Sequence, residues 1–290
     1  MKLKTIASAI IISTTLTGCV VHVGHSNAAD IELNQELILN TSEVDSLFVD
    51  NGAGSIDIVG IDGQQDIKVM ANIWTDEANN YKLSLTKSGT RAELIAHSNQ
   101  SSWNTNGNSS KINLTITMPQ KLALEIDDGS GSISVANLNN SLTIDDGSGE
   151  IKVSDVTGVV KIEDGSGGIE ATNINGNLTI SDGSGSIEVA DVTGDVKIKD
   201  GSGELGVRRV SGGVDIDDGS GSISVVDVKG FTKIIDNSGN LRVENIDNTV
   251  YIEDGSGDIT VRNTKGLEIN GAGSGQLYIK EINGPVSLDN

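Results

Sequence analysis

Residues 126–135 read IDDGSGSISV, and the same phrase returns eighteen residues later as IDDGSGEIKV and then as IEDGSGGIEA. The interval of eighteen residues is kept along the array, so this part of the chain is a tandem repeat of one short unit. A fixed period of this length is typical of a solenoid, in which each unit forms one coil and buries its apolar face only against its neighbours. The sequence therefore predicts a stack of similar coils.

Apolar residues recur at four positions of each unit, counted from the aspartate of the DGSG turn. In the unit that begins at Asp146 they are Ile151, Val153, Val160 and Ile162, at positions six, eight, fifteen and seventeen. Alternation of apolar and polar residues with a period of two predicts β-strands. We therefore predict an all-β fold: a single-chain parallel β-solenoid with 18-residue coils, two short strands per coil and two sheets about 10 Å apart.

The first residue of the turn is an aspartate in eight successive units. The turn glycines permit positive φ, and the aspartate and serine side chains can hydrogen-bond to amides of the turn. Counting the alternation onward from the apolar residue before the turn, as from Ile144 to Asp146, predicts that these carboxyl groups lean toward the coil interior. The eight residues are Asp128, Asp146, Asp164, Asp182, Asp200, Asp218, Asp236 and Asp254.

These eight aspartates allow two interpretations. In the first they cap the turns through hydrogen bonds, and the protein needs no cofactor or metal. In the second they bind calcium, as in β-rolls, whose coils also take eighteen residues but carry a different glycine and aspartate motif twice per coil. Because Ca²⁺ takes six to eight oxygen ligands, one aspartate per coil would need help from outer acids and carbonyls. We expect capping and keep a calcium-dependent β-roll as the alternative.

The amino-terminal residues have the features of a lipoprotein signal peptide. Lys2 and Lys4 precede an apolar run at residues 6–16 that is too short to span a bilayer. The run leads into LTGC, which resembles the lipobox of bacterial lipoproteins and contains Cys19, the only cysteine of the chain. The resemblance implies cleavage before Cys19 and attachment of lipid to its sulfur.

Residues 1–18 are thus predicted to be a signal peptide, and residues 19–46 a linker after the lipid anchor. Val20 rather than an aspartate follows the cysteine, and the resemblance to sorted lipoproteins then implies the outer membrane, on either its periplasmic or its surface-facing side. The anchor is the expected contact with the membrane. An envelope protein or a carbohydrate is the remaining class of expected partner.

The charge balance argues against nucleic acid as a partner. The chain has 41 acidic and 20 basic side chains and a formal net charge of −21, so polyanions and anionic lipid surfaces are repelled. Aromatic residues make up 2 % of the chain, which fits a thin core of aliphatic side chains between two close sheets. No nucleic-acid binding is expected.

The sequence also argues against catalysis. His22 and His25 lie in the predicted linker and His97 in the irregular segment, so no histidine is grouped with a nucleophile. Polysaccharide lyases with a β-helix fold have longer coils and grooves lined by basic residues. In this array Arg208 and Arg209 form the only adjacent basic pair. We expect no enzyme, with an envelope carbohydrate-acting β-helix enzyme as the second alternative.

Two regions follow the linker. Residues 47–122 are expected to contain a first coil, which begins near the glycine turn at 51–54, and then an irregular β segment that leads from that coil into the array. Residues 123–290 are expected to form the 18-residue repeat with a carboxyl-terminal cap. In the last copy, NGAGSG replaces the aspartate turn and places Ala272 at the aspartate position.

The early glycine turn, the strand segment INLTITMPQKLALEI at 112–126 and the G-S-G-x-I-x-V coils together resemble a family of bacterial β-strand-repeat proteins. Members of that family are grouped as adhesin candidates or as a domain of unknown function, and the resemblance covers about residues 47–290. It implies a β-solenoid exported to the cell envelope and brings no catalytic residues. We therefore expect a lipid-anchored cell-envelope protein with a structural or adhesin-like binding role.

Overall fold

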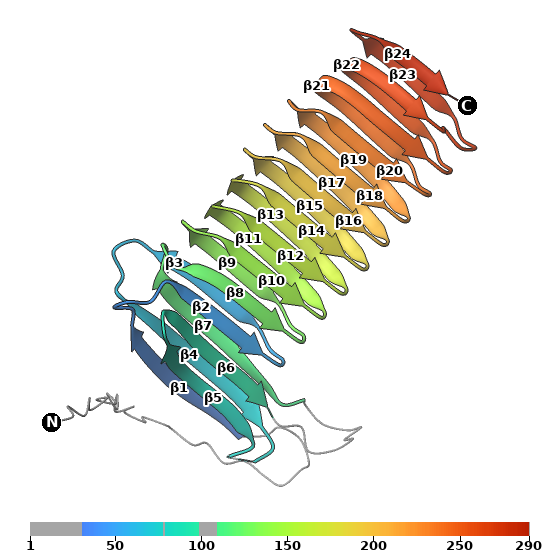
Figure 1. Ribbon diagram of the computed structural model, residues 1–290. Helices are drawn as coiled ribbons and strands as arrows, with labels where there is room; N and C mark the ends of the chain where they lie inside the picture. The colour runs from blue at the N-terminus through green and yellow to red at the C-terminus, as the bar shows by residue number, and fades with distance from the viewer. Residues whose placement is uncertain (1–30, 78, 99–108, 290) are drawn as a thin grey trace, which may run out of the picture.

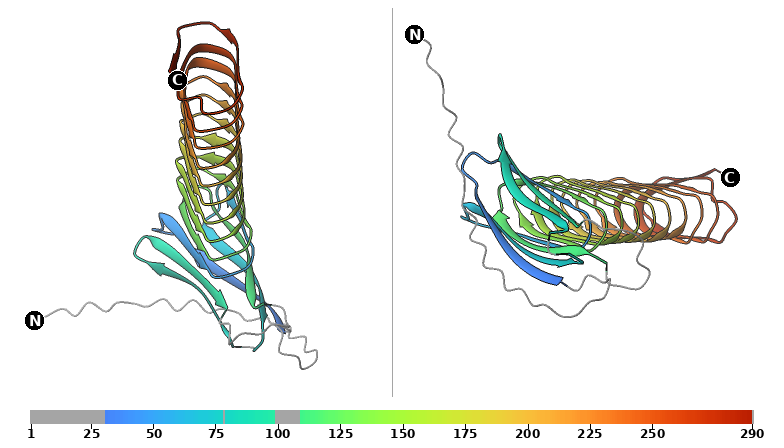
Figure 2. Two further views of the ribbon diagram at one scale, coloured as in Figure 1. Left: turned by 90° about the vertical axis from the view of Figure 1, so that its right-hand side faces the viewer. Right: turned by 90° about the horizontal axis from the view of Figure 1, so that it is seen from below.

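The computed structural model describes residues 31–77, 79–98 and 109–289, and all regular elements within them are β-strands. The strands form an elongated stack of coils, with the amino-terminal strands at one end and the carboxyl terminus at the other (Figure 1). Figure 2 shows the coils as flattened loops stacked on one another. Within the described ranges, no helix has the length and apolarity to cross a membrane.

Each repeat contributes one strand to each of two sheets. The strands before the DGSG turns are β8 (Ala123–Asp128), β10 (Leu142–Asp146), β12 (Val160–Asp164), β14 (Leu178–Asp182), β16 (Val196–Asp200), β18 (Val214–Asp218) and β20 (Thr232–Asp236). The strands after them are β9 (Ile133–Leu138), β11 (Gly149–Thr157), β13 (Gly167–Asn175), β15 (Gly185–Val192), β17 (Gly203–Val210) and β19 (Gly221–Val228). Each strand pairs in parallel with its equivalent one coil away, as Ile144 does with Ile126 and Ile162. The predicted parallel β-solenoid is confirmed.

The core consists of aliphatic columns that run along the stack. The four predicted positions are buried, and in the coil of β11 and β12 none of Ile151, Val153, Val160 and Ile162 is more than 1 % exposed. A fifth buried column lies at position eleven, which the sequence analysis did not assign to the core. Its members are Leu138, Val156, Ile174, Val192, Val210, Val228 and Ile246.

The fifth column is buried because the residue before it adopts a left-handed backbone conformation. Asp155 has a φ of 57°, and the ladder between β11 and β13 skips it while Val156 pairs with Ile174. The bend turns the next side chain inward without ending the strand. Asparagine and aspartate tolerate this conformation better than most residues, which accounts for their alternation along the stack. The residues are Asn137, Asp155, Asn173, Asp191, Asp227, Asn245 and Asn263, with Arg209 and Glu281 as exceptions.

The first coil stacks directly on the array. It consists of β2 (Ser46–Asn51) and β3 (Ile56–Ile61), which pair in parallel with β8 and β9. On their other side they pair in parallel with β6 (Arg91–Ser98) and β7 (Lys111–Pro119). The irregular segment therefore does not lie between the first coil and the array, as the sequence order suggested. It folds back over the outer side of the first coil.

Antiparallel strands close the amino-terminal end. β4 (Asp66–Thr75) pairs with β7, β5 (Tyr81–Ser88) pairs with β6, and β1 (Ile31–Asn40) pairs with β4, all antiparallel. The linker expected over 19–46 is thus corrected in its second half, because residues 31–40 alternate apolar and polar side chains and form β1. Leu33 and Leu37 of β1 pack against the core. Gln35 of β1 donates to the hydroxyl of Tyr81 on β5 at 2.5 Å, which joins the two sheets at this end.

The carboxyl-terminal end is built differently. β21 (Leu241–Asp254) and β22 (Ile259–Asn270) each run through both sheets, and their register shifts between Ile246 and Thr249. This coil is one residue shorter, so Gly271 rather than Ala272 lies beside Asp254. β23 (Leu277–Ile282) and β24 (Val286–Asp289) form the last described coil on top of β22.

Candidate functional site

The eight turn aspartates form one continuous column, here called the aspartate ladder. Asp128, Asp146 and Asp164 are direct partners on neighbouring strands, and the remaining five continue in the same register. All eight are between 1 % and 7 % exposed. The inward orientation expected from the alternation is therefore what the structure has, and it stacks eight carboxyl groups along one edge of the core.

In seven of the eight turns, one oxygen of the aspartate carboxyl group caps its own turn. The Oδ1 of Asp146 accepts a hydrogen bond at 3.2 Å from the backbone N–H of Ser148, two residues later. Six further turns repeat this bond at 2.9–3.3 Å. Gly149 then has a φ of 147°, and a Cβ at this position would lie 1.5 Å from the carbonyl oxygen of Gly131. The turn therefore requires glycine at its end and uses aspartate as its cap.

The other oxygen of each carboxyl group has no partner. In all eight aspartates of the ladder Oδ2 is buried and accepts no hydrogen bond from any described residue. A buried, unpaired carboxylate oxygen is costly, and the group responds by holding its proton more tightly. Protonation turns one such oxygen into a donor, and the neighbouring carboxyl group offers an acceptor.

The pKa values of the ladder follow from this burial. Burial, opposed by the hydrogen bond from the turn, raises the pKa of all eight aspartates above 3.8. The pKa of Asp128 rises to about 7, first through burial and then through the charge of Asp146. Burial, with neighbouring ladder charges contributing, raises the pKa of Asp164, Asp200 and Asp236 to about 6. Part of the ladder therefore retains protons close to neutral pH.

The ladder begins with an amide that the sequence analysis did not assign to it. Asn51, at the end of β2, pairs with Asp128 and is 2 % exposed. Its Nδ2 donates to Oδ1 of Asp128 at 2.9 Å. The alignment of NGAG at 51–54 with DGSG could have placed Asn51 in this column. The sequence alone did not show, however, that the first coil pairs with the first coil of the array. At the opposite end Gly271 follows Asp254.

The calcium alternative would require several ligands to converge on one point. Within the described ranges, no three side chains among histidine, cysteine, aspartate and glutamate are placed so that they could hold a metal ion. Moreover, Oδ1 of most ladder aspartates already accepts from the turn. The hydrogen bonds that the structure shows for these carboxyl groups are those of turn capping.

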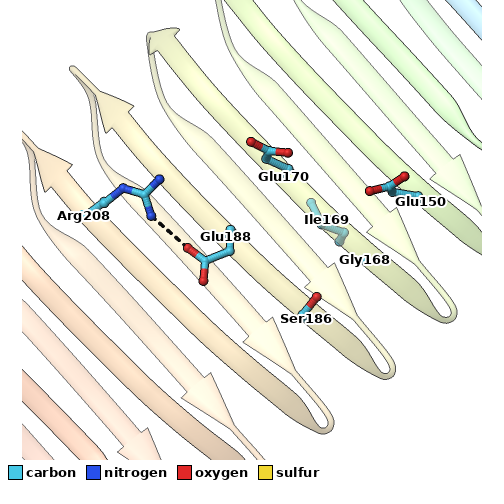
Figure 3. Close-up of a pocket in the computed structure, with 7 residues that line it drawn as sticks. All are labelled: Glu150, Gly168, Ile169, Glu170, Ser186, Glu188 and Arg208. Carbon is cyan, nitrogen blue, oxygen red and sulfur yellow. Dashed lines mark hydrogen bonds and ion pairs between the residues drawn. The ribbon is translucent and has the colours of Figure 1, made fainter.

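The outer face of the second sheet contains a shallow hollow of about 400 Å³. Figure 3 shows that Glu150, Glu170 and Glu188 reach into this region from successive strands, and that Arg208 points toward Glu188. Arg208 Nη1 donates to Glu188 Oε2 at 3.0 Å. Gly168 lines the hollow, where its lack of a side chain leaves the sheet surface open. Three of the seven lining residues are acidic and one, Arg208, is basic.

The adjacent basic pair does not form a basic groove. Arg208 is bound to Glu188, and Arg209 donates to both carboxylate oxygens of Asp191 at 2.7 and 2.6 Å. Both guanidinium groups are therefore neutralised by acids of the neighbouring coil. The only adjacent basic pair of the array is thus engaged in ion pairs along the stack.

His97 on β6 lies beside Asp50 on β2, with 2.6 Å between Nε2 and Oδ1. This contact joins two neighbouring strands of the first sheet. The predicted lipid attachment residue, Cys19, and the histidines His22 and His25 lie outside the described residues.

Comparison with known proteins places the chain in a family. The chain is similar to a candidate cell adhesion protein from Clostridium sporogenes, with 13 % identity, coverage of 85 % of this chain and 98 % of that one, and a TM-score of 0.29. It is also similar to a candidate adhesin from Parabacteroides distasonis, with 12 % identity, coverage of 88 % and 96 %, and a TM-score of 0.33. No protein of curated function matches. The sequence profile described as Toastrack DUF4097 matches residues 44–230, which is more than half of the chain, and the chain therefore belongs to this family.

Proposed function

We propose that this protein is a non-catalytic, lipid-anchored rod of the outer membrane with a structural or adhesin-like binding role. The observation that supports the proposal is the continuous parallel pairing of the stack from β6 and β7 to β23 and β24, with one register shift between β21 and β22. At about 4.8 Å per coil, such a stack is about 50 Å long. Because every coil is hydrogen-bonded to its neighbours, the rod is a stiff spacer.

The direction of the rod supports an anchoring role. The amino-terminal strand β1 lies at one end of the stack and the carboxyl terminus at the other (Figure 1). Cys19 precedes β1 by a short segment of chain, so a lipid on Cys19 would hold the amino-terminal end near the membrane. The carboxyl-terminal end would then be the distal tip, where a partner is most accessible.

The surface chemistry agrees with a rod that stands off a membrane. The chain has 41 acidic and 20 basic side chains, so its sides are repelled by anionic lipid headgroups. Contact with the membrane would therefore be confined to the anchor. The expected partner is an envelope protein or a carbohydrate, and nucleic acid is not one.

Two measurements test the proposal. Intact-mass analysis of the protein from the membrane fraction should show a chain that begins at Cys19 and carries acyl groups, and Cys19→Ala should release the protein into the soluble fraction. Labelling of a carboxyl-terminal epitope on intact and on permeabilised cells then gives the side of the membrane. A wild-type protein without acyl mass, or a Cys19→Ala variant that stays membrane-bound, would refute the anchor.

A further inference from the structure

The last described coil leaves the apolar core of the rod open. Its inward side chains continue the core columns, but Leu277 is 40 %, Val286 49 % and Leu288 48 % exposed. Ile279 and Ile282 are only partly buried against the core. No described residue covers these five side chains, which we call the end face. In every preceding coil of the repeat the same columns are buried.

The backbone at the end face is also unpaired on one side. Among the described strands, β23 and β24 each pair only with β22. Each strand therefore presents a row of N–H and C=O groups that lack a neighbouring strand. Such an edge is a template for pairing with another strand, and natural proteins usually cover or charge it. Here the edge and the apolar end face coincide.

The other end of the rod does not offer a matching surface. There the sheets end in the antiparallel strands β1 and β5, which Gln35 and Tyr81 connect by a hydrogen bond. Leu33, Leu37 and Leu83 of these strands pack against the core. A head-to-tail filament would need an open core at both ends, whereas a twofold contact uses the same surface on both partners.

We propose that the end face binds the end face of a second copy of this chain, so that two rods join tail to tail. A twofold axis perpendicular to the rod reverses strand direction across the contact. The strands β23 and β24 of one copy then meet antiparallel strands of the other, which can satisfy their free backbone groups. The apolar columns of the two rods become continuous.

The size and charge of the end face suit a second copy. β23 has six residues and β24 has four, and the two sheets lie about 10 Å apart, so the footprint is about 400 Å² per copy, or about 800 Å² in total, the size of a weak and transient contact. Between residues 276 and 289 the charged residues are Lys280, Glu281 and Asp289. Their net charge is −1 in a chain of −21, so like-charge repulsion between two copies of this tip is weak. We expect a dissociation constant on the order of micromolar.

This inference deepens the proposed function, because it names the partner of the adhesin-like rod as another copy of itself. Rods anchored through their amino-terminal ends in two facing membranes would meet at their tips. Many weak contacts between two such surfaces would add up through multivalency. The dimer itself does not depend on the anchor, so it can be tested separately.

The test measures the mass of the purified full-length chain in detergent by sedimentation velocity over a range of concentrations. The wild-type chain should shift from monomer to dimer in the micromolar range. Leu288→Glu and Leu288→Lys should each weaken dimerisation at least tenfold, because like charges then face each other. An equimolar mixture of the two variants should restore the dimer, since opposite charges meet across the same surface.

Phe231→Glu is the matched control, because Phe231 is 48 % exposed like Leu288 but lies on the side of the rod. It should leave dimerisation unchanged. Unchanged melting temperatures for the Leu288 variants exclude misfolding as the cause of their effect. A monomeric wild-type chain at all concentrations, Leu288→Glu with wild-type dimerisation, or a mixture that fails to associate would overturn the inference. Loss of membrane anchoring in Cys19→Ala with an intact dimer would instead refute only the anchored-rod function.

Discussion

Asn51 donates its side-chain amide to Oδ1 of Asp128 at 2.9 Å, although the two residues are 77 positions apart in the sequence. The contact joins the first coil to the repeat array and places a neutral donor at the start of the aspartate ladder. Asp128 still has a pKa of about 7, because burial and the neighbouring Asp146 outweigh the stabilising hydrogen bond. Asp128, the first aspartate of the ladder, is therefore the one whose pKa is raised most.

We expect Asn51→Asp to destabilise the protein by about 1–3 kcal/mol. The change removes the donor to Asp128 and adds a ninth buried carboxyl group beside it. Urea unfolding at pH 7.5 measures the effect. The control is Asn139→Asp, the same chemical change at an exposed position, which should alter the free energy of unfolding by about 0.5 kcal/mol or less. Equal effects of the two substitutions would contradict the placement of Asn51.

Asp182→Asn should be tolerated and should raise the melting temperature at pH 8. The amide oxygen can still accept from the N–H of Ser184, as Oδ1 does at 3.2 Å. The amide N–H group adds a donor beside carboxyl groups whose Oδ2 atoms lack one. It also removes one buried charge from the column. If the melting temperature of Asp182→Asn instead falls by many degrees, the carboxylate itself is required, as it would be if it were a metal ligand.

Chelation should leave the fold intact. If the ladder aspartates cap turns, EDTA will change neither the far-ultraviolet circular dichroism nor the melting temperature. If they bind calcium, removal of the ion will unfold neighbouring coils, because binding energy is then folding energy. NaCl at equal ionic strength separates specific binding from screening of the acidic surface. A large rise in melting temperature with millimolar Ca²⁺ alone would favour the β-roll alternative.

The repeat could be predicted in detail because its pattern is local and its neighbours are identical. Each coil lies on a copy of itself eighteen residues away, so the inward positions and the ladder follow from period-two alternation alone. Val156 was missed because its burial depends on the left-handed conformation of Asp155, which the alternation does not report. The alternation of asparagine and aspartate at position ten was the available indication.

The amino-terminal region could not be predicted in the same way. Residues 62–122 have no repeat that identifies their neighbours, and β4 pairs with β1 and β7, which are not its neighbours along the chain. The pairing of β2 with β8 therefore connects residues 77 positions apart. Alternation correctly indicated strands there, but strand order depends on long-range pairing. Because this pairing could not be predicted, Asn51 was not assigned to the candidate site.

Substitution by alanine should have very different effects on stability at two glycines of strand β17. Gly203 has a φ of 151°, and a Cβ would lie 1.5 Å from the carbonyl oxygen of Gly185, so Gly203→Ala should cost about 3 kcal/mol or more. At Gly206 the three atoms nearest to a Cβ would be the carboxylate atoms of Glu188, at 2.6–2.7 Å. That exposed side chain can move, and Gly206→Ala should change stability by about 0.5 kcal/mol or less. Urea unfolding of both variants checks the predicted difference.

The stability of the protein should fall as the pH rises from about 4 to about 8, the reverse of ordinary acid denaturation. The ladder aspartates have folded-state pKa values above 3.8, with Asp164, Asp200 and Asp236 at about 6 and Asp128 at about 7. At pH values between 3.8 and these folded-state pKa values, the folded state binds more protons than the unfolded state. By linkage, the free energy of unfolding then decreases with rising pH and levels off above about pH 8.

For Asp128 alone, a pKa raised from 3.8 to about 7 corresponds to a loss on the order of 4 kcal/mol across this window. Asp191 acts in the opposite sense, because its hydrogen bonds from Arg209 lower its pKa, but it is exposed and its contribution is small. Urea unfolding at pH 5 and pH 8 measures the difference. Asp128→Asn removes the group with the highest pKa and should flatten the pH dependence, with its largest gain in stability at pH 8. A wild-type protein that is more stable at pH 8 than at pH 5 would show that the ladder is fully ionised when folded, and that cations rather than protons compensate its charge.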